Sequence, residues 1–241
     1  MKTVIVGAGG AIGAAVVKRF ADAGCRVLGV DISEKALEQA SGLAGRMVCD
    51  LTDDRQLGRL RERLERDGID QVITTHGIDG SRPLGELSEA FYDKVLNINT
   101  IGTYRLFRAV LPLLKQSKGS FTIVVSQAGL KPEANNAAYC ASKYALSGWI
   151  RSISEYAAKE GVAVRGICPG CIGTPLYYAA QKQFAQSISM PLNEWLSQRE
   201  RNIPLGRIAD PAEIAECIWF LAQKSEKRPA LLAPTGGETL V

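Results

Sequence analysis

The sequence predicts an α/β fold: a Rossmann-type doubly wound parallel sheet with helices on both faces, in a single domain over residues 1–241. Three observations predict it. Short β-branched runs alternate with helical patterns, the first run ends in a glycine-rich turn, and polar residues follow the ends of the runs. Regular β-α alternation is typical of a parallel sheet. The 241 residues, 46% of them hydrophobic, suffice for one well-buried core.

The strand and helix patterns follow one another in order. We expect strands at residues 3–7, 26–30, 46–50, 70–74, 120–125 and 162–168, and a short strand or extended tail at 231–237. Helices are expected at 14–23, 53–66, 136–160 and 211–223, with two more between 88 and 115. Ligands of such sheets bind at the carboxyl ends of the strands. The residues that mark these ends are Gly7, Asp31, Asp50, Thr74, Ser126 and Cys168.

Composition argues against several classes of protein. The 29 basic residues are scattered among 25 acidic ones, whereas a nucleic-acid surface would need them clustered. No run of about eighteen apolar residues is present, so we expect no membrane span. The uncharged run 3–17 is broken by glycines, which argues against a signal peptide. The six cysteines are expected to be reduced thiols in a cytoplasmic protein, and no metal site is expected.

A glycine-rich turn joins the first strand to the first helix. Residues Gly7 to Gly13 read Gly-Ala-Gly-Gly-Ala-Ile-Gly. Glycines let the backbone approach a pyrophosphate, and the following helix N-terminus offers N–H groups and a positive dipole end. Asp31 ends the next strand, where a carboxylate can accept hydrogen bonds from an adenosine ribose. The pattern predicts a dinucleotide site, the alternative being a glycine-rich turn with a surface aspartate.

Asp31 also bears on the choice of cofactor. A carboxylate at this position would repel a 2′-phosphate. No Lys or Arg lies within the glycine turn or directly after Asp31. The sequence therefore favours NAD over NADP.

A hydroxyl, a phenol and an amine lie close together in the sequence at Ser126, Tyr139 and Lys143. On a helix, Tyr139 and Lys143 lie one turn apart on the same face. An ammonium beside a phenol favours the phenolate, so we expect a lowered pKa for Tyr139. Such a phenol can act as general acid or base on an alcohol or ketone oxygen, and Ser126 could hydrogen-bond that oxygen.

With these residues in place, essentially the whole chain resembles the short-chain dehydrogenase/reductase family. Tyr139-Cys-Ala-Ser-Lys143 matches the family's Y-x-x-x-K motif, with Ser126 at the family's spacing before it. Asn99 matches the asparagine that completes the catalytic tetrad, and residues 169–174 resemble the P-G-x-x-x-T stretch that flanks the nicotinamide. The late I-P-L-G-R and P-x-E-I stretches of the family are matched from Ile203 and Pro211.

The resemblance implies a role for each matched residue. Tyr139 would be the general acid/base, Lys143 would lower its pKa and contact the nicotinamide ribose, and Ser126 would hold the substrate oxygen. Asn99 would help to position a proton-relay water, and Asp50 would contact the adenine. The implied cofactor-binding set is Gly7, Gly9, Gly10, Ala11, Ile12, Gly13, Asp31, Ile32, Asp50, Leu51, Thr75, His76, Gly77, Tyr139, Lys143, Pro169, Gly170, Ile172 and Thr174.

The predicted function is therefore an NAD-dependent oxidoreductase that interconverts a secondary alcohol and a ketone by hydride transfer. A first alternative is an NADP-dependent 3-oxoacyl-[acyl-carrier-protein] reductase, which Asp31 disfavours. A second is a regulatory protein that senses dinucleotides without catalysis, which the intact tetrad disfavours. Family members usually pair through two long helices, here near 100–115 and 137–160, so a homodimer or homotetramer is expected by analogy.

Some positions depart from the family pattern. Val6 replaces a hydroxyl residue, and Ala11 replaces the second glycine of the turn. The family's N-N-A-G reads Thr-Thr-His-Gly at 74–77, so we expect threonine hydroxyls to replace the asparagines that brace this loop. His76, the single histidine, occupies the alanine position, which favours a loop or cofactor-lining role over direct catalysis.

Two further stretches remain open to interpretation. Cys168-Pro-Gly-Cys171 has the spacing of a redox or metal pair, but it coincides with the turn expected beside the nicotinamide. Residues 174–202 are polar and aromatic and too long for a simple connector, which predicts a partly helical lid or substrate loop. We expect some of its aromatic side chains to face the substrate.

Overall fold

The computed structural model describes residues 1–134, 136–223 and 228–239. Its centre is a parallel sheet of seven strands in the order β3-β2-β1-β4-β5-β6-β7. The strands are β1 (Lys2–Val6), β2 (Arg26–Asp31), β3 (Gly45–Val48), β4 (Gln71–Thr74), β5 (Ser120–Val124), β6 (Ala163–Ile167) and β7 (Leu231–Leu232). The predicted Rossmann-type fold is confirmed.

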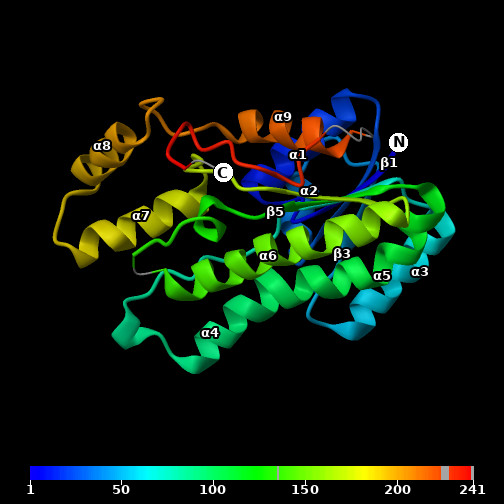
Figure 1. The fold of residues 1–241 in the computed structure, drawn as a ribbon, viewed down its shortest axis with the longest axis horizontal. Helices are drawn as coiled ribbons and strands as arrows, with labels where there is room; N and C mark the ends of the chain where they lie inside the picture. Colours follow the sequence, from blue (N-terminus) through cyan, green and yellow to red (C-terminus); the bar gives the residue numbers. More distant parts are fainter. Residues whose placement is uncertain (135, 224–227, 240–241) are drawn as a thin grey trace.

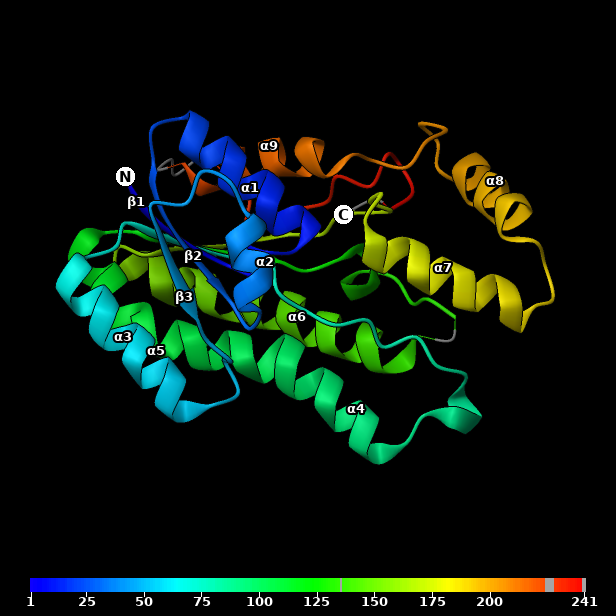
Figure 2. The same ribbon diagram turned by 180° about the vertical axis from the view of Figure 1, so that it is seen from behind.

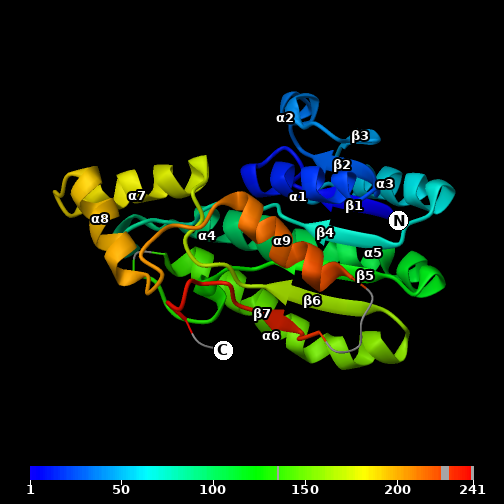
Figure 3. The same cartoon turned by 90° about the horizontal axis from the view of Figure 1, so that it is seen from above.

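Helices cover both faces of this sheet (Figures 1 and 3). One face carries α1 (Ala11–Asp22) and α9 (Pro211–Ala222), which lie against each other. The other carries α3 (Asp54–Asp67), α5 (Gly102–Ser117) and α6 (Ala137–Lys159), with α4 (Glu89–Leu96) extending from α5. The short α2 (Glu34–Gln39) lies beside β2 and β3.

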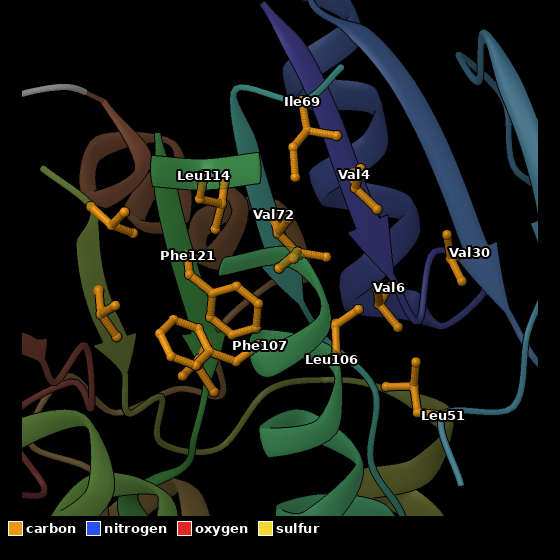
Figure 4. Packing of buried hydrophobic residues seen from close by; sticks show 14 of the residues in the cluster. Val4, Val6, Val30, Leu51, Ile69, Val72, Leu106, Phe107, Leu114 and Phe121 are labelled. Atoms are coloured by element: carbon orange, nitrogen blue, oxygen red, sulfur yellow. The ribbon is translucent and has the colours of Figure 1, made fainter. Parts of the chain in front are cut away.

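The alternation of side chains along β1 feeds a separate core on each face. Val4 and Val6 join the cluster under α3, α5 and α6, which also holds Phe107 and Phe121 (Figure 4). Ile5, between them, joins the opposite cluster with residues of α1 and α9. Successive side chains of a strand point to opposite faces, so a strand buried on both sides is apolar throughout. The sheet is therefore a rigid platform that fixes its carboxyl edge.

Two helices extend beyond that carboxyl edge (Figure 2). They are α7 (Pro175–Ser187) and α8 (Leu192–Asn202), and they fill the stretch predicted to be a lid or substrate loop. Thr174 caps α7 by accepting a hydrogen bond from the Tyr177 N–H, and Pro175 occupies the first turn. The Trp195 indole donates to Gln181 at 2.8 Å and holds α8 against α7. Within the described residues, none of the helices combines the length and apolarity needed to span a membrane.

Candidate active site

The glycine turn lies in close contact with its neighbours. A Cβ on Gly13 would overlap the Gly7 carbonyl, so only glycine allows α1 to start this close to β1. Gly10 is the N-cap of α1 and provides no side-chain cap, so the first N–H groups of the helix are open to water or to an anionic ligand. The Asp31 carboxylate accepts from the Gly9 N–H and the Ser33 N–H, each at 3.0 Å. The predicted glycine turn and the predicted acid are therefore in direct contact.

The loop after β4 braces this turn through a hydroxyl, as expected from the departure at 74–77. The Thr75 Oγ1 lies 3.0 Å from the carbonyl oxygens of both Val6 and Gly7. Thr74, in contrast, is a buried residue of the strand itself. One threonine thus takes over the bracing expected of the asparagines.

Ser126, Tyr139 and Lys143 meet at the carboxyl end of β5. Ser126 lies just beyond the strand, and its hydroxyl forms a hydrogen bond with Tyr139. Tyr139 and Lys143 lie one turn apart on α6, and the Lys143 Nζ is 5.4 Å from the centroid of the phenol ring. The Lys143 ammonium is buried and donates to the Val124 carbonyl at 3.1 Å. The arrangement places a phenol, a hydroxyl and a cation around one point of the sheet edge.

The prediction of a lowered pKa for Tyr139 is wrong for the site that the protein's own residues form. Burial raises the pKa of this phenol well above its ordinary value, and the hydrogen bond with Ser126 offsets only part of the rise. Glu133 and Asp79 raise the pKa further because their charges disfavour a phenolate. Burial also lowers the pKa of Lys143 to about 8, which weakens its hold on a proton.

Asn99 lies in a π-helical segment, Asn97–Ile101, between α4 and α5. Its side chain is buried and its amide is engaged on both sides: Oδ1 accepts from the Ile78 N–H at 2.9 Å, and Nδ2 donates to the Ile78 carbonyl at 3.0 Å. Nδ2 also lies 3.1 Å from the Ser142 hydroxyl of α6. The side chain therefore holds the loop after β4 against the helix that carries Tyr139. π-Bulges are frequent at functional sites.

His76 lines the same loop beneath the glycine turn. Its Nε2 lies 3.3 Å from the Thr103 hydroxyl, and its backbone N–H group lies against Gly7. Burial and the charge of Lys143 lower its pKa to about 4, so the ring is neutral at physiological pH. This position agrees with the expected loop-lining role.

A cleft of ≈ 410 Å³ opens from Tyr139 towards α7 and α8. It is lined by six of the residues predicted to bind cofactor, namely Ile12, Tyr139, Pro169, Gly170, Ile172 and Thr174. Of the aromatic residues in the stretch after Thr174, Tyr177, Phe184 and Trp195 line it, whereas Tyr178 is exposed. Asp50 and Leu51 lie at the end of β3, and Ile32 is exposed beside Asp31.

The far end of the cleft holds an ionic cluster that sequence reasoning did not identify. Arg199 of α8 donates to Glu238 at 2.9 Å, and Lys131 lies 3.0 Å from the same carboxylate. Burial alone would raise the pKa of Glu238, but these two hydrogen bonds outweigh it and hold the pKa below its ordinary value. The three residues come from distant parts of the chain with no shared motif, so no sequence signal could have brought them together.

Cys168 and Cys171 lie in different surroundings. All six cysteines are free thiols. Cys168 is buried at the end of β6, and burial raises its pKa to about 11. Cys171 instead lies beside the ionic cluster, 3.0 Å from an Arg199 nitrogen. The Pro-Gly turn between them lines the cleft.

Comparison with known proteins identifies the family. A family model described as enoyl-(acyl carrier protein) reductase matches residues 7–228. A protein of Mus musculus named L-fucose dehydrogenase is 34% identical over 248 residues, covering 98% of this chain and 88% of the relative. The chain belongs to the short-chain dehydrogenase/reductase family. Members of this family are oxidoreductases that bind nicotinamide dinucleotides and act on small molecules.

Other members of the family match with different printed activities. The 3-oxoacyl-[acyl-carrier-protein] reductase FabG of Thermotoga maritima is 31% identical over 229 residues, covering 91% of this chain and 89% of the relative. The crystal structure of levodione reductase superposes with a TM-score of 0.90 at 25% identity, covering 98% of this chain and 96% of the other. Family membership therefore determines neither the substrate nor the choice between NAD and NADP. Both depend on the residues of this chain.

Proposed function

We propose that this protein is an NAD-dependent dehydrogenase that interconverts a secondary alcohol and a ketone. The observation that carries the proposal is the meeting of Ser126, Tyr139 and Lys143 at the sheet edge that also holds the glycine turn. One edge thus has a proton-transfer group and the cradle of a hydride carrier. Bound NAD would supply the hydride acceptor at C4 of its nicotinamide.

The residues present fit that cofactor. The uncapped N-terminus of α1 suits a pyrophosphate, and Asp31 is held by two backbone N–H groups where it could accept from ribose hydroxyls. The Asp31 carboxylate disfavours a 2′-phosphate by charge repulsion. Gly77 lies next to Asn99 and Lys143, so the loop after β4 would form the floor beneath the nicotinamide ribose. NAD is therefore preferred to NADP.

Tyr139 is proposed as the general acid/base, with Ser126 orienting the substrate oxygen. The raised pKa keeps the phenol protonated, which suits donation to a ketone oxygen. Alcohol oxidation needs the phenolate, which Lys143 and a cationic nicotinamide would favour by charge. Asn99 acts through the loop and helix it joins.

The segment 174–202 is proposed to cover the substrate, because three of its aromatic side chains line the cleft. We propose that copies of the chain pair through α5 and α6, as a dimer or tetramer. Tyr104 on α5 and Tyr144 and Tyr156 on α6 are exposed, which supports an apolar contact there. Within the proposal, the protein has no nucleic-acid or membrane partner.

The alternative activities are less well supported. The name of the Thermotoga maritima relative favours a 3-oxoacyl-[acyl-carrier-protein] reductase. We expect that alternative to be NADP-dependent. Asp31 argues against NADP as the cofactor. Both hydrogen bonds to the Asp31 carboxylate come from backbone N–H groups and not from a cation. A cofactor-sensing protein without catalysis would not need Ser126, Tyr139 and Lys143 in contact.

Substitution of Tyr139 tests the proposal. We expect Tyr139→Phe to lower kcat/KM for alcohol oxidation by about 10²- to 10⁴-fold, because the proton acceptor is lost. NAD affinity, measured by fluorescence titration, should stay within about threefold, since most cofactor contacts are elsewhere. Tyr144→Phe, on the exposed side of the same helix, is the matched control. Equal turnover by Tyr139→Phe and wild type, or a strong preference for NADP, would contradict the proposal.

A further inference from the structure

Two carboxylates in the cleft wall beside Tyr139 have no part in the proton transfer. Asp79 comes from the loop after β4, and Glu133 comes from the segment between β5 and α6. Both lie close enough to Tyr139 to disfavour its phenolate. Their charges hinder a reaction that must form the Tyr139 phenolate. We therefore look for their role in substrate binding and not in proton transfer.

Two side-chain donors hold Glu133 in the wall of the cleft. Its Oε1 accepts from Gln127 Nε2 at 3.3 Å, and its Oε2 accepts from Asn136 Nδ2 at 3.2 Å. Gln127 is itself buried, and its backbone N–H donates to the Pro169 carbonyl. Each carboxylate oxygen can accept two hydrogen bonds, so both retain capacity for a further donor.

Asn136 supplies a third acceptor. A carboxylate only accepts, so the Asn136 Nδ2 must face Glu133 and Oδ1 must face away from it. The residue lines the cleft with 8% of its surface exposed, and its buried Oδ1 has no partner among the described residues. Buried acceptors are normally satisfied, so an unpartnered one in a binding cleft points to a donor on the ligand.

Asp79 is brought close to Tyr139 by tight backbone packing. A Cβ on Gly80 would lie 2.7 Å from the Tyr139 backbone nitrogen, so the loop lies directly against the start of α6. The Ser81 N–H and hydroxyl donate to the two Asp79 oxygens at 3.1 and 2.9 Å. These bonds fix the carboxylate in the cleft wall and still leave it free to accept.

The cations of the cleft are occupied elsewhere. Lys131 and Arg199 both bind Glu238 at the far end, and Lys143 is buried and donates to the Val124 carbonyl. Around the reacting position the wall therefore offers hydrogen-bond acceptors and negative charge. A ligand there needs several donors and no negative charge of its own.

We propose that the substrate is a neutral polyhydroxylated molecule, a vicinal diol or sugar, whose hydroxyl next to the reacting carbinol donates to Glu133 and Asn136. A second hydroxyl would donate to Asp79. The proposal rests on the dehydrogenase function proposed above and names its substrate class. Glu133 and Asn136 are the residues that determine specificity.

The same wall disfavours other substrates. A phosphorylated or carboxylated alcohol would place its charge near Asp79 and Glu133. A simple ketone or a 3-oxoacyl thioester lacks the extra hydroxyls and would leave the acceptors unpaired, which strongly lowers affinity in sites built for hydrogen bonds. An amino alcohol also matches the charge of this wall, and the panel below includes one as the competing outcome.

A matched panel of alcohols tests the proposal with the full-length wild-type protein. The panel consists of cyclohexanol, cis-1,2-cyclohexanediol, 2-aminocyclohexanol, D-glucose and D-glucose 6-phosphate, each assayed with NAD and with NADP. We expect kcat/KM for the diol to exceed that for cyclohexanol by about tenfold or more, the worth of one hydrogen bond to a charged group. Glucose should likewise exceed glucose 6-phosphate.

Variants then assign the preference to its residues. Glu133→Gln and Asn136→Ala should each lower the ratio of kcat/KM for the diol to kcat/KM for cyclohexanol by about 10-fold or more. The ratio is the measure because loss of the Glu133 charge also lowers the pKa of Tyr139 and so acts on both alcohols. Glu86→Gln, an exposed carboxylate of the same connecting loop as Asp79, is the control and should not change the ratio. Thermal unfolding verifies that each variant is folded.

Three results would overturn the proposal. The diol and cyclohexanol could react equally well, the amino alcohol or the phosphate could be the better substrate, or Glu133→Gln could affect both alcohols equally. Any of these leaves the dehydrogenase itself intact. If no alcohol in the panel reduces either cofactor, the dehydrogenase proposal fails as well, and the two failures are thereby distinguished.

Discussion

Burial has opposite consequences for the two titrating residues of the proposed proton path. It raises the pKa of the Tyr139 phenol and lowers that of the Lys143 ammonium to about 8, because both shifts favour the neutral form. The protein's own residues thus favour a neutral phenol beside an ammonium that holds its proton weakly. A positive charge arriving next to the phenol would move it towards the phenolate, which couples proton transfer to cofactor charge.

His76 gives a pH-dependent contribution to stability. Its pKa is lowered from 6.5 to about 4, so the unfolded chain binds more protons between these values and stability falls as the pH falls. Wild type should lose roughly 2 kcal/mol more than His76→Ala between pH 7.5 and pH 5, measured by urea unfolding. Identical pH dependence in the two proteins would show that the ring is not buried as a neutral group.

The residues of the proton path could be predicted from the sequence because they share a motif. Tyr139 and Lys143 are one helical turn apart, and Ser126 ends a recognisable strand. The shift of the Tyr139 pKa could not be predicted, because it depends on burial and on Asp79 and Glu133. Those carboxylates reach the phenol through loop packing, for which the sequence carries no periodic signal.

Among the elements, the strands and long helices follow from hydrophobic periodicity, and their predicted positions are confirmed to within a few residues. The short α2 was missed because its six residues give too brief a pattern, although Ser33 caps it as an N-cap residue should. The π-helical segment at Asn97–Ile101 was also missed. It continues a helical pattern without a break, and only the backbone hydrogen-bond pattern of the structure reveals it.

The helices α7 and α8 are tied to the body of the molecule by Arg199 and Glu238. The Glu238 side chain is 8% exposed, and its second partner is Lys131. The network joins α8, the segment before α6 and the C-terminal tail. We therefore expect this network to control how firmly the proposed lid is held against the cleft.

Removal of one cation should loosen this lid. Arg199→Met leaves Glu238 buried with Lys131 alone, and we expect a loss of roughly 2–4 kcal/mol in urea unfolding. Hydrogen exchange of the α7 and α8 amides should accelerate as well. Arg201→Met, an exposed position on the same helix, should change stability by less than about 0.5 kcal/mol.

A compensating variant makes this prediction specific. Arg199→Met combined with Glu238→Gln removes the uncompensated charge and should recover part of the loss. If the double variant is as unstable as the sum of the two single variants, the pair does not act as a buried ion pair.

At the scale of the whole molecule, the fold gathers distant segments at one sheet edge. β1, β2, β4, β5 and β6 are parallel, so their carboxyl ends bring together Gly7, Asp31, Thr75, Ser126 and Cys168. The lid and the tail then close a cleft that begins at Tyr139. This convergence could be predicted from the order of strands and helices, whereas the polarity of the cleft required the structure.

Transfer of a labelled hydride tests the proposed reaction most directly. Wild-type protein is incubated with NAD and the best alcohol of the panel, deuterated at the reacting carbinol carbon, and the reduced cofactor is analysed by mass spectrometry. We predict one deuterium in the nicotinamide ring, with the transfer slowed by about 10²-fold or more in Tyr139→Phe. Absence of label in the reduced cofactor, or equal transfer by Tyr139→Phe, would contradict an alcohol dehydrogenase that uses Tyr139 as its acid/base.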